Sequence, residues 1–208
     1  MPFAAIFCFV LVLFFFLRFQ KMTWTPGSSR NLALFHKGMA TFSAFLLALY
    51  GAAFHPAAGN ILLCAGLLIC TAADVVLGKN LMRGMAVFGL GHVFYCIGYG
   101  VKMPPNFLSL IIFLLLLVLC CFLYPQIKKR SGSKPPLPFL CYGVLLFLML
   151  ALAFHQSPVL LTGAFLFVAS DLLLAFRIFT QNQSKLLDYI CLACYYLAQY
   201  LIALSIFF

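Results

Sequence analysis

Two similar stretches of sequence decide the fold: Cys64–Leu77, CAGLLICTAADVVL, and Leu161–Leu174, LTGAFLFVASDLLL. In each stretch a glycine stands eight residues before an aspartate, Asp74 or Asp171, and three aliphatic residues follow the aspartate. The whole chain has only three acidic residues, so two of the three lie inside long apolar runs. An ionised side chain within a membrane-spanning helix costs roughly 2.5–3.5 kcal/mol on insertion scales. Because of that cost, we interpret Asp74 and Asp171 as the centre of a functional site.

The composition excludes a soluble globular domain. Hydrophobic residues make up 66% of the chain and charged residues 8%, and the mean hydropathy is +1.15. So little polar surface cannot cover a globule in water. Open sheets would leave backbone groups unpaired in lipid, and barrel strands would alternate in hydropathy. We therefore predict an all-α polytopic membrane protein, with residues 1–208 forming a single transmembrane domain.

The net charge of +10 does not indicate a nucleic-acid partner. The basic residues stand in short gaps between apolar runs, where membrane topology and lipid phosphates explain them. The nine cysteines are odd in number and irregularly spaced, so they do not describe a disulfide framework. Cys191-x-x-Cys194 is the only spacing typical of metal ligands, and no second ligand pair stands near it, so we predict no metal site.

Eight apolar segments are each close to the roughly 20 residues that a helix needs to cross a 30 Å hydrocarbon layer. Between them the chain is interrupted by glycine, proline and charged residues, as at Pro104-Pro105. We predict eight transmembrane helices, over residues 3–19, 32–50, 59–78, 84–101, 107–124, 138–155, 158–178 and 187–207.

The connections between these segments alternate in charge. The second and sixth connections carry no basic residue, and the fourth carries only Lys102. By the positive-inside rule the odd connections are cytoplasmic, and both termini lie on the non-cytoplasmic side. The odd connections hold Arg18, Lys21 and Arg30, then Lys79 and Arg83, then Lys128, Lys129, Arg130 and Lys134, and finally Arg177 and Lys185.

The two aspartates share one predicted depth in the membrane. Asp74 lies five residues before Lys79 and Asp171 six before Arg177, so each is roughly 7–9 Å inside the cytoplasmic boundary. Their separation, 171 − 74 = 97 residues, covers four spans. An even number of spans indicates two parallel four-helix halves rather than an inverted repeat.

Two carboxyl groups at one depth in a low-dielectric bundle should not both be ionised. Burial and mutual repulsion favour one protonated acid beside one carboxylate. Glycosidases use such a pair for general acid–base hydrolysis, in a reaction that passes through an oxocarbenium ion. The alternative interpretation is that Asp74 and Asp171 only hydrogen-bond across helices or pair with a lysine.

Further polar residues are predicted to complete the site. His92 and Tyr95 are three residues apart and share a helix face, and Tyr195, Tyr196 and Gln199 mark a polar face of the last span. Tyrosines at membrane interfaces are ordinary, whereas His92 and Gln199 are costly in lipid, which favours positions inside the bundle.

Lys37 is predicted to lie level with the aspartates, at the cytoplasmic mouth of the second span. It could neutralise a carboxylate or hold a phosphate, and snorkelling to the interface explains it equally well. Asp188, in the first turn of the last span, suits the helix dipole and is assigned no chemistry.

These motifs resemble the YhhN / lysoplasmalogenase family of eight-span membrane proteins. Their order and spacing are specific, and they extend from the second predicted span to the eighth, with Lys37 a weaker match. Ala73 departs from the family, which usually has glycine before the first aspartate. The matching blocks are ADVVL at 73–77, RGMAVF at 83–88, GHVFY at 91–95, GAFLF at 163–167, SDLLLA at 170–175 and YYLAQ at 195–199.

The resemblance implies hydrolysis of the vinyl ether bond of lysoplasmalogens, which gives a fatty aldehyde and glycerophosphoethanolamine or glycerophosphocholine. Acid cleavage of a vinyl ether needs a proton at the β-carbon and capture of the resulting oxocarbenium ion by water, which suits Asp74 and Asp171. The sequence leaves open which of them is the acid. Lys37, Lys79 or Arg83 would bind the phosphate of the lysophospholipid, and no metal or organic cofactor is required. The membrane would be the bacterial cytoplasmic membrane or, in a eukaryote, the endoplasmic reticulum.

Two other function classes fit the same residues. A proton-coupled transporter would use the aspartates as a proton relay, but such proteins need discontinuous helices, and the two aspartate-bearing spans lack an internal proline. In a non-catalytic interaction protein the aspartates would only join helices, and Asp→Asn changes would be tolerated.

Overall fold

The computed structural model describes residues 2–130 and 136–208. Within these residues the chain forms eight α-helices and one short 3-10 helix, and no strand, which confirms the all-α prediction. The helices are α1 (Pro2–Thr23), α2 (Arg30–Phe54), α3 (Ala58–Lys79), α4 (Leu81–Lys102), α5 (Phe107–Arg130), α6 (Pro136–Ala153), α7 (Pro158–Thr180) and α8 (Lys185–Leu204), followed by η1 (Ser205–Phe207).

Polar residues between the apolar runs set the helix ends. Side chains of Ser29, Ser157 and Ser184 cap α2, α7 and α8 by accepting a backbone N–H of the first turn. Asn80 ends α3 and caps α4, so a single residue joins these two helices. Gly84 makes that tight turn possible, because a Cβ there would lie 2.3 Å from the Cα of Leu77.

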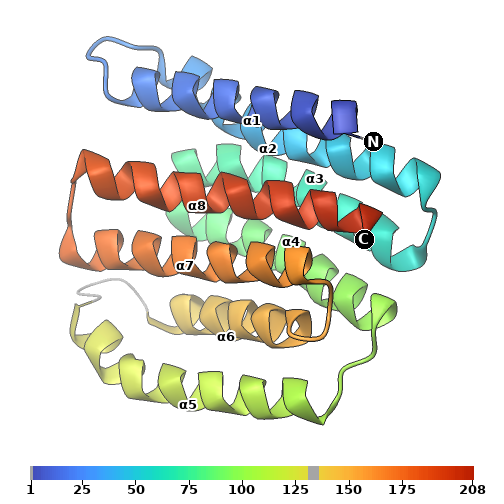
Figure 1. The fold of residues 1–208 in the computed structure, drawn as a ribbon. Coiled ribbons are helices and arrows are strands. Elements are labelled where there is room, and N and C mark those ends of the chain that lie inside the picture. Colours follow the sequence, from blue (N-terminus) through green and yellow to red (C-terminus); the bar gives the residue numbers. More distant parts are fainter. Residues whose placement is uncertain (1, 131–135) are drawn as a thin grey trace.

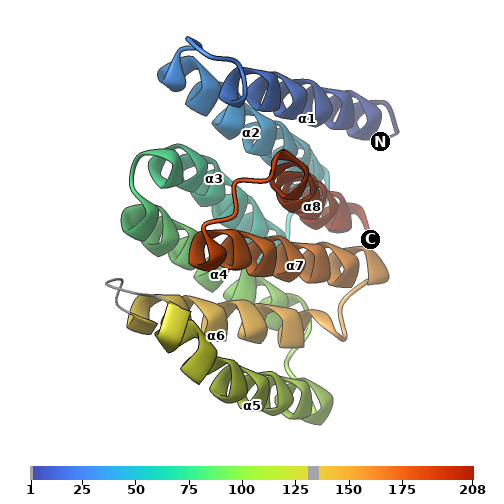
Figure 2. The same ribbon diagram turned by 90° about the vertical axis from the view of Figure 1, so that its left-hand side faces the viewer.

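The helices run alongside one another, with α1 and α2 on one side, α5 and α6 on the opposite side, and α3, α4, α7 and α8 between them (Figures 1 and 2). Helix α3 packs on α4 and α7 on α8, while α2 packs on α8 and α6 on α4. Both termini lie at the same end of the bundle.

The glycines of the two similar stretches have matching structural roles. A Cβ on Gly66 of α3 would lie 3.1 Å from the backbone oxygen of Gly91 on α4. A Cβ on Gly163 of α7 would lie 3.2 Å from the backbone oxygen of Ala198 on α8. Each glycine therefore lets its helix approach the next one closely, as small residues do in membrane bundles.

Within the part of the chain that the structure describes, six helices are long and apolar enough to cross a membrane: α1, α2, α3, α4, α7 and the continuous segment of α8 and η1, Lys185–Phe207. Among the described residues, α5 and α6 carry shorter apolar stretches, Phe107–Phe122 and Leu137–Ala153. The polytopic class agrees with this result, and the count of eight spans stays a prediction.

Several polar side chains are buried inside the bundle. Thr41, Asp74, His92 and Gln199 are at most 1% exposed, whereas large apolar side chains of α1 and α5, such as Phe3, face outward. A bundle that turns apolar side chains outward and polar ones inward suits a lipid surrounding. The buried polar groups of α2, α3, α4 and α8 mark where the site lies.

Candidate active site

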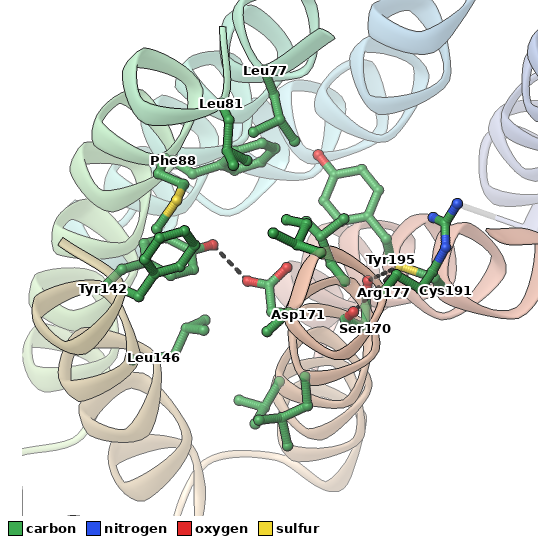
Figure 3. Close-up of a pocket in the computed structure, with 18 of the residues that line it drawn as sticks. Leu77, Leu81, Phe88, Tyr142, Leu146, Ser170, Asp171, Arg177, Cys191 and Tyr195 are labelled. Atoms are coloured by element: carbon green, nitrogen blue, oxygen red, sulfur yellow. Dashed lines mark hydrogen bonds between the residues drawn. The ribbon is translucent and has the colours of Figure 1, made fainter. Parts of the chain in front are cut away.

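A cavity of about 230 Å³ lies among α3, α4, α6, α7 and α8, with single contributions from α1, α2 and α5. Both Asp74 and Asp171 line it, so the structure brings the two predicted carboxyl groups to one space. Most of the remaining lining is aliphatic or aromatic; Figure 3 shows Leu77, Leu81, Phe88 and Leu146 among these side chains. The polar lining residues are Lys37, Asp74, Tyr142, Ser170, Asp171, Arg177, Asp188 and Tyr195.

Asp74 is surrounded by donors. Its Oδ2 accepts hydrogen bonds from the hydroxyl of Thr41 at 2.5 Å and from the hydroxyl of Tyr195 at 2.8 Å. The ammonium of Lys37 lies 3.5 Å from its Oδ1. Lys37 and Thr41 are four residues apart on α2, which places both on the face towards α3. Two hydroxyl donors and one cation each favour the ionised form of a buried carboxyl group.

A chain of hydrogen bonds behind Asp74 orients Tyr195. The hydroxyl of Tyr95 donates to Oε1 of Gln199 at 2.7 Å, and Nε2 of Gln199 donates to the hydroxyl oxygen of Tyr195 at 3.1 Å. All three side chains are buried. Because Tyr195 accepts from Gln199, its own proton is directed to Asp74. Tyr95 and Gln199 are therefore positioning residues.

Asp171 lies in a different environment. The hydroxyl of Tyr142 on α6 donates to its Oδ2 at 2.5 Å, and Figure 3 shows the two side chains facing each other across the cavity. Among the described residues no cation lies within ion-pair distance of Asp171. Asp171 thus accepts a hydrogen bond from one neutral donor, whereas Asp74 accepts from two neutral donors and also lies beside a cation. This asymmetry distinguishes the two carboxyl groups.

A second charged cluster lies farther along α7. Arg177 donates from Nη1 to Oδ1 of Asp188 on α8, and Gln20 of α1 donates from Nε2 to Oδ2 of Asp188 at 3.1 Å. The indole N–H of Trp24 donates to Oε1 of Gln20 at 3.1 Å. Arg177 and Asp188 both line the cavity that holds the two aspartates.

Of the ten predicted site residues, Asp74, Asp171, Lys37 and Tyr195 line the cavity. The ammonium of Lys37 faces a carboxylate, in agreement with one of its three predicted roles. Tyr196 does not line the cavity; its hydroxyl donates to the backbone oxygen of Lys37 at 3.3 Å and so joins α8 to α2.

The other predicted residues lie outside the cavity lining. His92 is fully buried, donates from Nδ1 to the backbone oxygen of Phe88 at 2.6 Å, and packs edge-on against Phe167. Its Nε2 has no hydrogen-bond partner within the described part of the chain. Lys79 and Arg83 are exposed beside the turn between α3 and α4. That they bind a phosphate stays a prediction.

Sequence reasoning missed five polar residues of the site: Thr41, Tyr142, Ser170, Arg177 and Asp188. Thr41 stands four residues after Lys37, a spacing that indicates a shared face. Tyr142 is a polar residue in an otherwise apolar span, and that was its only signal. In the sequence Arg177 indicates only the membrane topology, and Asp188 indicates only a favourable charge at the start of a helix. Asp188 does lie in the first turn of α8, and it also accepts hydrogen bonds from α1 and α7.

Comparisons with known proteins identify sequences that are similar to this chain. The sequence model of the YhhN family matches residues 32–206. Human "Lysoplasmalogenase TMEM86B" is 32% identical over 158 residues, which cover 72% of this chain and 66% of that protein. The chain thus spans just under two thirds of the length of this relative. No solved structure matches the chain.

Proposed function

The chain belongs to the YhhN family, and from this premise we propose that it is a lysoplasmalogenase-like hydrolase. Its substrates would be 1-alkenyl lysophospholipids, whose vinyl ether bond it would cleave to a fatty aldehyde and glycerophosphoethanolamine or glycerophosphocholine. One observation carries the proposal: Asp74 of α3 and Asp171 of α7 line the same, mostly apolar cavity. Such a cavity suits a single alkenyl chain, with two carboxyl groups at the bond to be cleaved.

The different surroundings of the two carboxyl groups support different roles. Asp74, with Lys37, Thr41 and Tyr195 around it, is the carboxylate. Asp171, with one neutral donor and apolar neighbours, is the group that keeps a proton in a low-dielectric site. Asp171 is therefore the proton donor, and Asp74 stabilises the positive charge that develops. Pairs of titratable groups in contrasting environments commonly divide the acid and base roles in this way.

The reaction balances with these two groups and one water. The carboxylic acid of Asp171 delivers its proton to the β-carbon of the vinyl ether, and the α-carbon becomes an oxocarbenium ion facing the carboxylate of Asp74. Water adds to the α-carbon while the Asp171 carboxylate accepts a proton from that water, which gives a hemiacetal and restores the acid form of Asp171. The hemiacetal then breaks its bond to the glycerol oxygen, its hydroxyl proton passes to that oxygen, and aldehyde and alcohol are released. The steps use side chains and water, without a metal or organic cofactor.

The membrane arrangement is part of the proposal. Eight spans in two parallel four-helix halves, with both termini non-cytoplasmic, are supported by the position of both termini at one end of the bundle. In a parallel repeat, α1–α4 correspond to α5–α8, so that α2 corresponds to α6 and α4 to α8. The contact between α2 and α8 then corresponds to the contact between α6 and α4, and the structure has both contacts. The matching roles of Gly66 and Gly163 fit the same exchange.

The transporter alternative is not favoured by the helices that carry the aspartates. Transport sites of the known repeat folds are formed by broken helices. Here α3 and α7 are each continuous through their aspartate, over Ala58–Lys79 and Pro158–Thr180.

The experiment that tests the proposal is aldehyde release by the detergent-purified protein from a 1-alkenyl lysophospholipid in D₂O. We expect one deuterium on the carbon next to the aldehyde group, because that carbon takes the proton from Asp171. A saturated 1-alkyl lipid of the same length, which has no carbon–carbon double bond to protonate, is the control and should release nothing. The absence of aldehyde from every alkenyl lipid tested would contradict the proposal.

A further inference from the structure

The ion pair of Arg177 and Asp188 is an unusual feature of a cavity that suits an apolar chain. Both side chains line that cavity and both are mostly buried, with 17% and 12% of their side-chain surface exposed. Arg177 also lines a second hollow, with Leu174, Ile178 and Gln181–Gln183 at the end of α7. Arg177 therefore lies between the cavity and the hollow at the connection between α7 and α8.

The pair has hydrogen-bonding capacity that the protein leaves unused. Nε of Arg177 is buried, and no described residue accepts a hydrogen bond from it. A buried donor without a partner is costly unless a ligand or water satisfies it. The carboxylate of Asp188 accepts one bond at each oxygen, and a carboxylate offers about four acceptor positions.

The spacing along α7 matches the length of the proposed substrate. Arg177 follows Asp171 by six residues, which is about 9 Å of helical rise. Seven bonds separate the β-carbon of a lysoplasmalogen from its phosphorus, and an extended chain of seven bonds covers roughly 8 Å. A substrate with its vinyl ether at Asp171 therefore brings its phosphate to Arg177. The amine follows four bonds later, about 4–5 Å away, which reaches the carboxylate beside Arg177.

We infer that Arg177 and Asp188 form the head-group subsite, in which Arg177 binds the phosphodiester and Asp188 the ammonium of a zwitterionic head group. This inference rests on the proposed function. The pair and the head group are each net neutral, so their association brings no net charge into a low-dielectric site. A phosphate monoester without an amine would leave Asp188 beside uncompensated negative charge. The subsite thus selects ethanolamine and choline lipids against 1-alkenyl glycerol 3-phosphate.

Selectivity between two substrates with the same tail tests this inference. With the purified full chain, we expect kcat/KM for 1-alkenyl glycerophosphoethanolamine to exceed that for 1-alkenyl glycerol 3-phosphate by at least tenfold. Asp188→Asn should abolish this preference, mainly through KM for the ethanolamine lipid. Arg18→Gln, which removes an exposed arginine of α1, is the matched control and should keep the preference. A merely structural pair would lower both activities by the same factor.

The only tryptophan of the chain gives a second measurement that does not depend on turnover. Trp24 is joined through Gln20 to Asp188, so its fluorescence should respond when a head group binds. Titration with the uncleavable 1-alkyl glycerophosphoethanolamine should give a saturable change. Arg177→Lys keeps the charge but loses the planar fork that fits a phosphate, so it should weaken this binding at least tenfold.

The outcomes separate the subsite from the proposed function. Aldehyde release with a head-group preference that neither Asp188→Asn nor Arg177→Lys alters would overturn the subsite and leave the hydrolase standing. Binding of the alkyl lipid that Arg177→Lys weakens, without aldehyde release from any alkenyl lipid, would keep the subsite and overturn the hydrolase.

Discussion

Tyr142 of α6 and Asp171 of α7 are joined by a hydrogen bond of 2.5 Å, in which the phenol donates to Oδ2 of the carboxyl group. This bond leaves Oδ1 of Asp171 for the proton that the proposed reaction delivers. It also fixes the direction in which the carboxyl group faces the cavity, because α6 holds Tyr142 on the opposite wall.

Tyr142→Phe should therefore slow the reaction without unfolding the protein. Removing one oriented donor is expected to lower kcat about tenfold, which corresponds to ~1.4 kcal/mol, with little change in KM. Aldehyde release at saturating substrate measures the effect. Tyr50→Phe, at an exposed position of α2, is the control and should keep the wild-type kcat. Unchanged kcat in Tyr142→Phe would mean that this bond does not orient the acid.

Lys37→Met should destabilise the protein, because it leaves the buried carboxylate of Asp74 without its cation. Breaking a buried ion pair by removing one partner costs about 3–5 kcal/mol. Unfolding in a denaturing detergent mixture measures the loss. The double variant Lys37→Met/Asp74→Asn removes the unpaired charge and should regain most of the stability while remaining inactive. Equal instability of the single and double variants would argue against the ion pair as the cause.

Gln199→Leu should disrupt the hydrogen-bond chain that orients Tyr195. The hydroxyls of Tyr95 and Tyr195 both lose a partner inside the bundle, which is expected to cost about 1–3 kcal/mol of unfolding free energy. Tyr95→Phe should lower the unfolding free energy less in the Gln199→Leu background than in the wild type, because both changes remove the hydrogen bond between Tyr95 and Gln199. Additive losses in this double-mutant cycle would show that the two side chains act independently.

Fusions at the C-terminus test the proposed orientation. With eight spans and the basic connections in the cytoplasm, a reporter fused to Phe208 is expected on the non-cytoplasmic side. In a bacterial host, alkaline phosphatase fused there should be active and green fluorescent protein should be dark. A truncation after Lys102, which removes four spans, should give the same result, because an even number of spans remains. Fluorescent full-length fusions would show an odd number of spans or the opposite orientation.

The sequence was sufficient for the all-α class, and it singled out the two aspartates for a physical reason. A carboxyl group in an apolar run is rare and costly, so Asp74 and Asp171 stood out without any knowledge of packing. Lys37 and Gln199 stood out in the same way, and the structure brings both to the hydrogen-bond network of Asp74.

Other parts of the site could not be read from the sequence because their meaning depends on how the helices pack. A hydroxyl such as that of Thr41 or Tyr142 costs little free energy in a membrane-spanning helix, so it does not stand out in the sequence. Only the packing of α2 on α3 and of α6 on α7 gives it a hydrogen-bond partner. Arg177 looks like any basic residue at a span end, until α8 places Asp188 beside it. Conversely, His92 stood out in the sequence and lies outside the cavity lining, among aromatic rings.

The measurement that tests the central claim most directly is aldehyde release by Asp74→Asn and Asp171→Asn beside the wild type. The amide keeps the size of each side chain but can neither deliver the proton nor carry the negative charge. We expect release by the wild type and a loss of at least a thousandfold in each variant, ~4 kcal/mol, with folding intact by size exclusion and circular dichroism. Wild-type rates of release in either folded variant would contradict catalysis by the paired carboxyl groups.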